Sequence, residues 1–206
     1  MDELNKLEAL QLDALKEVAN IGAGHAATAL SQLTDRRIMI SVPQINVTGL
    51  EGLSDVVLDP DEIVAAVLMH MLGDLTGRTL LLLPEANAKL LCDLLLRRTP
   101  GTTESFEDLE RSGLKEAGNI LGGAYMNALS DFMGMMLLPS VPSLEIDVAA
   151  AVITSAQLGF GRDWDHVFCV ETDFHFEEAG RKLKGHFLLL PDLASLKAIL
   201  DAIQLT

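Results

Sequence analysis

The chain has 206 residues, of which 49% are hydrophobic, so it can build a packed core and lacks the composition of a disordered protein. Its formal net charge of −15 disfavours binding to nucleic acid, which requires clustered lysine and arginine to neutralise phosphates. An acidic chain instead favours a basic or metal-bearing protein partner.

Cysteine, histidine and targeting signals are uninformative in this sequence. Cys92 and Cys169 lie in apolar runs without disulfide or metal-ligand spacing, which predicts small buried side chains in a reducing compartment. The five histidines form no zinc motif. No signal peptide is evident, and the apolar runs are far shorter than the roughly 20 residues needed to span a membrane. We therefore expect a cytoplasmic protein without a metal site or membrane insertion.

The first expected element is a long helix from about residue 3 to residue 33. One face is apolar at helical spacing, through Leu12, Leu15, Ala19, Gly22, Ala26, Leu30 and Leu33. At about 100° per residue, the opposite face carries a polar stripe of Asp13, Glu17, Asn20, Gly24 and Ser31.

Strands and a second helix are expected to follow. The predicted strands are residues 37–42, 44–47, 64–69 and 78–83, with a hairpin turn at 73–77, and the predicted helix is 85–97. Residues 98–105, which include Pro100 and Gly101, are the expected connector to the second half.

The second half repeats this order. Its long helix points Leu114, Ala117, Leu121, Ala128 and Phe132 inward, and Ser112, Glu116, Asn119, Gly123 and Ser130 outward. Strands are expected at 145–153, 167–176 and 184–190, and a closing helix at 192–203. Residues 77–84 (GRTLLLLP) resemble residues 185–191 (GHFLLLP). We expect an α/β (α+β) fold in which two homologous halves, about 1–98 and 105–206, form a single domain with a shared β-sheet and a pseudo-twofold axis.

The strongest signal is a short pattern that occurs twice, 99 residues apart. An Asp or Ser is followed after three residues by Glu, after two more by Asn, and after 22 more by Pro. Segments 15–43 and 114–142 are identical at 12 of 29 aligned positions. The chain is therefore a duplicated unit. The residues that are repeated most strictly form a polar stripe, whereas a duplication maintained only by packing would more naturally repeat its apolar residues.

Both copies place unfavourable residues in the middle of their helices. Glycine costs roughly 1 kcal/mol relative to alanine in a helix interior, and asparagine about 0.6 kcal/mol. Asn20 and Asn119 nevertheless lie mid-helix, with glycines nearby at positions 22, 24, 118, 122 and 123. On a buried face, glycine allows close packing. On the outward face, at Gly24 and Gly123, it allows the backbone of another macromolecule to approach closely.

The residue types of the stripe exclude several kinds of catalytic site. A merely solvated helix face is the alternative interpretation, but it does not explain why the same residues recur. The stripe has no nucleophile–base pair, too few carboxylates for a glycosidase and too few oxygen ligands for a metal. What remains is a pair of groups that act in a partner's active site. A carboxamide can orient a water molecule, and a carboxylate can pair with lysine or arginine. Phosphoryl transfer depends on such alignment.

The repeated Asp/Ser-x3-Glu-x2-Asn-x22-Pro pattern resembles the signature of the CheC family of CheY-phosphate phosphatases, which act in bacterial and archaeal chemotaxis. Segments 17–27 (EVANIGAGHAA) and 116–134 (EAGNILGGAYMNALSDFMG) are also similar to that family. Among the relatives, CheX carries one motif per chain, FliY adds a flagellar switch domain, and FliM-like middle domains lack the phosphatase residues. Two motifs in a chain of this length fit CheC best.

The resemblance implies roles for the repeated residues. Asn20 and Asn119 would orient the water that attacks the aspartyl phosphate, and Glu17 and Glu116 would pair with the response regulator's active-site lysine. Supporting positions would be Asp13, Ser112, Pro43, Pro142, Gly24 and Gly123. Mg²⁺ would belong to the response regulator, so no cofactor is expected on this chain.

The resemblance also implies a second partner, the receptor deamidase CheD. Two alternatives to a phosphatase stay open at this point. One is a non-catalytic module that sequesters or regulates CheD, and the other is a structural part of the flagellar switch. Because two internal sites mimic a dimer, we expect a monomer.

Overall fold

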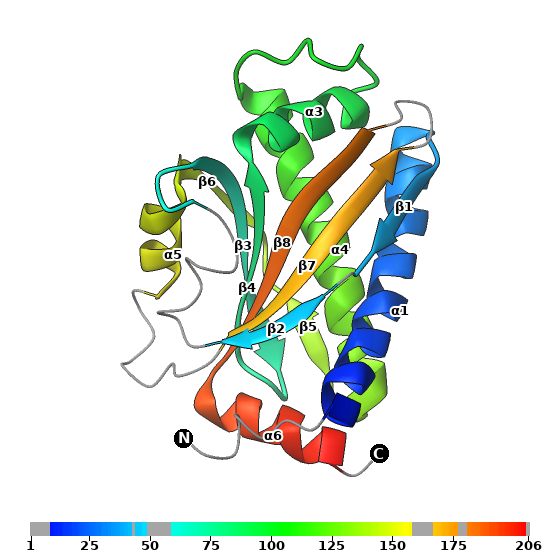
Figure 1. Ribbon diagram of the computed structural model, residues 1–206, viewed down its shortest axis with the longest axis vertical. Coiled ribbons are helices and arrows are strands. Elements are labelled where there is room, and N and C mark those ends of the chain that lie inside the picture. Colours follow the sequence, from blue (N-terminus) through cyan, green and yellow to red (C-terminus); the bar gives the residue numbers. More distant parts are fainter. Residues whose placement is uncertain (1–8, 43, 49–58, 158–166, 177–180, 205–206) are drawn as a thin grey trace.

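The computed structural model describes residues 9–42, 44–48, 59–157, 167–176 and 181–204. In this part of the chain, eight strands form one antiparallel sheet, and two helices of 26 residues each pack across one of its faces (Figure 1). None of the helices in the described residues is long and apolar enough to cross a membrane.

Each half runs from a long helix through short strands and a long hairpin to a shorter helix. The first half consists of α1 (Ala9–Thr34), β1 (Ile38–Ser41), β2 (Ile45–Thr48), β3 (Ile63–Gly73), β4 (Gly77–Pro84) and α3 (Glu85–Leu95). The second consists of α4 (Asp108–Met133), β5 (Leu137–Pro139), β6 (Ser143–Val148), α5 (Ala149–Gln157), β7 (Val167–Phe176), β8 (Arg181–Pro191) and α6 (Leu193–Gln204).

The halves exchange strands within the shared sheet. Its order is β1-β7-β8-β4-β3-β5, with β2 also beside β7 and β6 also beside β3. The short strands of each half therefore pair with the hairpin of the other half. At the centre, β4 and β8 pair antiparallel, with Gly77 opposite Pro191 and Leu82 opposite His186. The two similar segments, 77–84 and 185–191, thus lie side by side, and the expected shared sheet with two long helices is confirmed.

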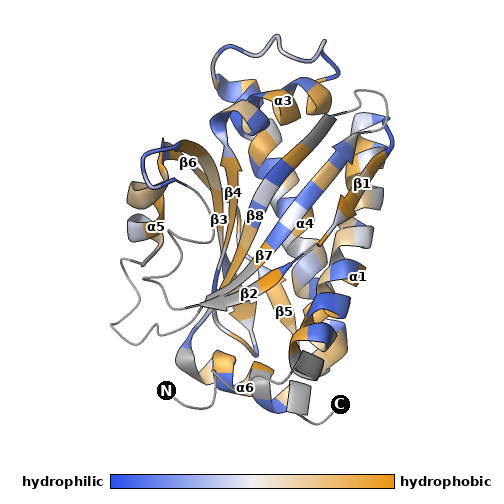
Figure 2. Ribbon diagram, in the orientation of Figure 1, coloured by the Kyte–Doolittle hydropathy of each residue, from blue (hydrophilic) through white to orange (hydrophobic). Residues whose placement is uncertain are grey.

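The position of strand β4 in the sheet explains why its sequence is apolar at consecutive positions. Leu81 and Leu83 belong to the core beneath α1 and α4, whereas Leu80 and Leu82 belong to the core beneath α5. A strand that is buried on both faces has no solvent side for polar residues to occupy. Figure 2 shows the resulting hydrophobic band along β4 and β3.

Two expectations about the elements are wrong. The strand predicted at 145–153 ends at Val148, and Ala149 begins helix α5. An apolar run of this length fits a buried strand or a helix equally well, and alanine-rich sequence favours the helix. Leu33 was expected to point inward, but it is 42% exposed, because Leu30 and Thr34 are the buried residues of that turn. Strand β5 was not anticipated at all.

The connector between the halves is organised around the buried carboxylate of Asp93. It accepts hydrogen bonds from the backbone N–H groups of Gly101 (2.6 Å), Thr102 (3.1 Å) and Thr103 (2.9 Å). It also accepts bonds from the Thr102 and Thr103 hydroxyls, at 3.0 and 2.6 Å. Burial raises the pKa of Asp93, but the bonds from Thr103, Gly101 and Thr102 outweigh it and hold that pKa below its ordinary value.

The same region fixes the start of α4. Glu107 and Glu110 form a reciprocal capping box, and Glu110 is also paired with Arg98 at 2.5 Å. A helix whose first turn is anchored in this way holds the side chains of its next turns in a defined direction. Those turns carry Glu116 and Asn119.

We expect Asp93→Ala to lower the free energy of unfolding by about 3 kcal/mol, because it leaves the buried N–H and hydroxyl of Thr103 and the partly buried N–H groups of Gly101 and Thr102 without their acceptor. Urea denaturation measures the change. Asp201→Ala is a matched control, since Asp201 lies in the corresponding helix α6 but is exposed, and it should change stability by less than about 0.5 kcal/mol.

The difference between wild type and Asp93→Ala should depend on pH. Because the folded-state pKa lies below the ordinary value of 3.8, the contribution of Asp93 is complete above that value and is lost as the pH falls through the folded pKa. A stability difference that stayed constant down to roughly pH 2 would contradict the assigned role of this carboxylate.

Candidate functional site

The polar stripe of α1 lies on the side of the helix that faces away from the sheet. Asp13, Glu17, Asn20 and Gly24 are all exposed. The opposite side is buried through Leu15, Ala19, Ala23, Ala26 and Leu30. The 3.6-residue period of the sequence therefore predicted the direction of every one of these stripe residues.

The second stripe lies on α4 in the corresponding positions. Ser112 and Glu116 are exposed, whereas Asn119 and Gly123 are half-buried. The two copies are thus similar in direction but not in accessibility, since Asn119 is more enclosed than Asn20.

Helices α1 and α4 pack directly against each other and run in opposite directions (Figure 1). Gly22 makes part of this contact possible, because a Cβ atom there would lie 2.7 Å from Cδ1 of Tyr125 and 3.0 Å from its Cα. The two stripes consequently belong to one layer of the molecule and share its outer surface. We call the stripe residues of α1 site one and those of α4 site two.

The repeated Glu and Asn side chains are not used by the fold. No hydrogen bond or ion pair joins Glu17, Asn20, Glu116 or Asn119 to another side chain within the described residues. Each Glu offers two acceptor oxygens, and each Asn offers both an acceptor and donors. Because these groups are unsatisfied internally, they are available to water or to a partner.

The helix glycines fall into two groups. A Cβ atom at Gly118 would lie 2.5 Å from Cγ1 of Val67, so this glycine lets α4 approach β3 closely. At Gly24 and Gly123, by contrast, no atom lies within 4 Å of the position that a Cβ would occupy. Packing therefore explains the buried glycine but not the two stripe glycines.

Two residues that the periodicity assigned to the stripe have a structural role instead. The Ser31 hydroxyl accepts a hydrogen bond from the N–H of Ile38 at 2.9 Å, and the Ser130 hydroxyl donates to the carbonyl of Met135. Both serines are half-buried and hold the strand that follows their helix. Of the two motif prolines, Pro142 is half-buried immediately before β6, and Pro43 lies outside the described residues.

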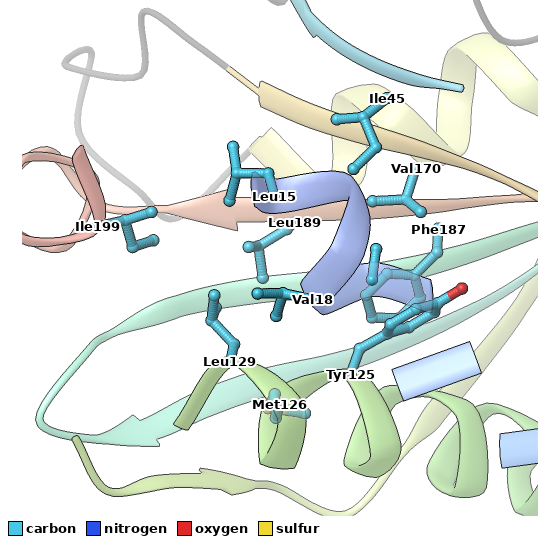
Figure 3. Close-up of a pocket in the computed structure, with 11 residues that line it drawn as sticks. Leu15, Val18, Ile45, Tyr125, Met126, Leu129, Val170, Phe187, Leu189 and Ile199 are labelled. Carbon is cyan, nitrogen blue, oxygen red and sulfur yellow. The ribbon is translucent and has the colours of Figure 1, made fainter. Parts of the chain in front are cut away.

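An apolar cavity lies beneath site one (Figure 3). It is lined from α1 by Leu15 and Val18, and from α4, α6 and β8 by Leu129, Ile199 and Leu189. Among the described residues that line the cavity, Tyr125 alone has a hydroxyl, which lies 3.2 Å from the Thr172 hydroxyl, within hydrogen-bond distance. Burial raises the pKa of Tyr125 to about 12. The described lining of the cavity therefore contains no ionised group, whereas the exposed Glu17 carboxylate lies on the outer surface of α1.

No group of three or more His, Cys, Asp or Glu side chains able to hold a metal ion occurs among the described residues. Cys92 is a free, buried thiol, as its apolar surroundings predicted. Desolvation by burial and the nearby Glu110 and Asp93 carboxylates raise the pKa of Cys92 to about 12, so it remains a neutral thiol.

Comparisons with known proteins give a consistent result. Residues 10–47 and 109–146, the two motif regions, match the sequence profile of the CheC-like family. The chain is 33% identical over 205 residues to the CheY-P phosphatase CheC of Bacillus subtilis (strain 168), covering 98% of each protein. It is 23% identical over 203 residues to the flagellar motor switch phosphatase FliY of the same organism, covering 98% of this chain and 51% of that longer protein.

Solved structures show the same fold at lower identity. FliY of Thermotoga maritima superposes with a TM-score of 0.77 at 22% identity, covering 97% of this chain and 98% of that one. The FliM middle domain from H. pylori superposes with a TM-score of 0.70 at 13% identity, covering 95% and 99%.

The two groups of glycines lead to opposite expectations for alanine substitution. Gly24→Ala and Gly123→Ala should each raise the free energy of unfolding by up to about 1 kcal/mol, because alanine is the better helix former and meets no neighbour. Gly118→Ala should lower it by about 1–3 kcal/mol, because the methyl group overlaps Val67. Chemical denaturation of the three variants measures the size and the sign of each change in the free energy of unfolding. Destabilisation by Gly24→Ala would show that this position is constrained by packing.

Proposed function

Because this chain belongs to the CheC-like family, we propose that it is a chemotaxis phosphatase that hydrolyses the aspartyl phosphate of a CheY-type response regulator. The observation that carries this proposal is the repeated Glu–Asn pair, which is exposed or half-buried at both sites and has no side-chain partner within the described residues. The 33% identity to a CheY-P phosphatase over nearly the whole chain supports the same substrate.

In the proposed reaction, the Asn carboxamide aligns a water molecule with the phosphorus atom. The water oxygen forms a new bond to phosphorus as the bond to the aspartyl oxygen breaks, which releases inorganic phosphate and restores the carboxylate. Such a transition state requires positioning more than covalent help. A carboxamide suits this task because it accepts and donates hydrogen bonds without itself becoming protonated.

The Glu of each site has a docking role in this proposal. Glu17 lies one helical turn before Asn20, and Glu116 one turn before Asn119. An exposed carboxylate at that distance can pair with the active-site lysine of the response regulator while the Asn reaches the phosphoryl group. The stripe glycines leave room for the partner's backbone beside these two side chains.

Mg²⁺ is bound by the response regulator in this proposal, and this chain supplies no metal ligand. Asp13, Ser112, Pro43 and Pro142 keep supporting roles in the helices and in the strands that follow. A cytoplasmic location, a monomeric state and CheD as a second partner stay predictions, and none of the described residues is assigned to CheD.

Removing the Asn side chains should abolish the activity without unfolding the protein. If each Asn stabilises the transition state by about 3 kcal/mol, its loss slows dephosphorylation at that site by about 100-fold. We therefore expect Asn20→Ala and Asn119→Ala each to retain the activity of the other site, and the double variant to lose nearly all of it. The decay of phosphorylated CheY in the presence of substoichiometric protein measures these rates.

The outcomes of this experiment separate an enzyme from a binding module. Full activity in the double variant would refute the water-positioning mechanism. A wild-type protein that affects phosphoryl lifetime only at amounts comparable to its partner, or not at all, would favour a binding module that regulates CheD.

Glutamate substitutions should act on docking. We expect the Glu17→Ala, Glu116→Ala double variant to raise KM more than it lowers kcat, because an exposed ion pair contributes to association. The difference from wild type should shrink as salt increases, since exposed charges are screened. Asp61→Ala removes one exposed negative charge away from both helices and should change KM little. An effect of the glutamate changes on kcat alone would contradict the docking role.

A further inference from the structure

The outer faces of α1 and α4 carry exposed apolar side chains beside the Glu–Asn pairs. On α4, Leu109 is 57% exposed and lies seven residues before Glu116, so that at about 100° per residue the two point within about 20° of each other. On α1, Ile21 is 47% exposed and directly follows Asn20. Leu109 therefore precedes the polar stripe of α4, and Ile21 flanks the polar stripe of α1 between Asn20 and Gly24.

Packing does not account for these two residues. The first turn of α4 is fixed by Glu107, Glu110 and Arg98, none of which requires an apolar side chain at position 109. A single exposed leucine is common on protein surfaces and carries little information. Here, however, both positions are repeated with the stripe, since Leu10 corresponds to Leu109 and Ile120 to Ile21 at the same 99-residue spacing.

We infer that Leu109 in site two and Ile21 in site one are apolar anchors that contact the response regulator on the surface that surrounds its phosphorylated aspartate. This inference rests on the proposed function and specifies the partner's surface, which must combine a basic side chain, the phosphoryl group and a neighbouring apolar patch. Protein interfaces combine an apolar centre with charged and polar contacts at the rim, and a few residues of an interface supply most of its affinity.

The two sites use their anchors differently. Ile120 is half-buried and packs against the core, whereas its counterpart Ile21 is exposed. Among the side chains that the structure describes, site one has its exposed apolar residue directly after the Asn, and site two has its exposed apolar residue before the Glu. The partner therefore meets an exposed apolar side chain at a different place along the stripe in each site, and we expect the two sites to differ in affinity for a given response regulator.

The test uses full-length protein in which one site at a time is silenced. In the Asn20→Ala background, which leaves site two, Leu109→Ser should raise KM for the phosphorylated response regulator by about 10-fold and change kcat by less than about twofold. In the Asn119→Ala background, which leaves site one, Ile21→Ser should have the same effect. Each substitution should raise KM only in the background in which the site on its own helix remains active.

Matched variants control for general surface effects. Val141→Ser removes a side chain that is 89% exposed but lies off both helices, and it should leave KM unchanged. Leu109→Met keeps an apolar side chain and should retain a KM close to that of its parent. Equal thermal unfolding of all variants would show that the substitutions act on the complex.

A binding measurement separates this inference from the proposed function. The dissociation constant for the response regulator activated with beryllofluoride, a phosphoryl mimic, needs no turnover. If wild type accelerates dephosphorylation but Leu109→Ser and Ile21→Ser change neither KM nor this constant, the anchor assignment is wrong and the phosphatase proposal stands. If wild type binds without turnover and both substitutions weaken binding about 10-fold, the phosphatase proposal fails and the anchors stand. Absence of both turnover and binding would overturn the two together.

Discussion

The antiparallel pairing of β4 with β8 is the interaction on which the rest of this structure depends. It joins the two hairpins at the centre of the sheet, and each hairpin then receives the short strands of the opposite half. This arrangement sets α1 and α4 next to each other on a single face. Two copies of one helix thereby present their polar sides outward from the same layer, which neither half would achieve as an isolated unit with one uncovered hairpin.

Each long helix combines close packing on its inner side with residues of low helix propensity on its outer side. Their inner sides require small residues, so that α1 approaches α4 at Gly22 and α4 approaches β3 at Gly118. Their outer sides keep glycine and asparagine where a better helix former would fit. Tertiary packing stabilises the helices enough to tolerate these local costs. The residues that reduce helix propensity without any packing benefit are therefore the ones to associate with function.

Sequence periodicity and duplication predicted most of this architecture, including the direction of Glu17 and Asn20, the 73–77 turn and the limits of β7. They failed where burial depends on distant segments. The apolar run at 145–153 did not by itself distinguish a strand from helix α5, which begins at Ala149 and packs on β3 and β6, and the exposure of Leu33 follows from which side of the last turn meets the sheet. The bonds of Ser31 and Ser130 to the backbone of the next strand could not be distinguished from an outward polar position. The different accessibility of Asn20 and Asn119 also required the structure, because each Asn follows the same Leu-Lys-Glu triplet and precedes an Ile.

The exchange of strands has a consequence for how such a protein changes over generations. Since β1 and β2 depend on β7, and β5 and β6 depend on β3, neither half can be discarded without removing support from the other. The Glu and Asn side chains on the outer helix faces are not constrained in this way, because among the described residues Glu17, Asn20, Glu116 and Asn119 form no hydrogen bond or ion pair with another side chain. One site can therefore lose its activity, or become adapted to a different response regulator, while the half that carries it is retained because it supports the fold of the other half. Because the halves are duplicated and pair their strands with each other, the fold has a second polar helix surface. Substitutions can accumulate on that surface without destabilising the core.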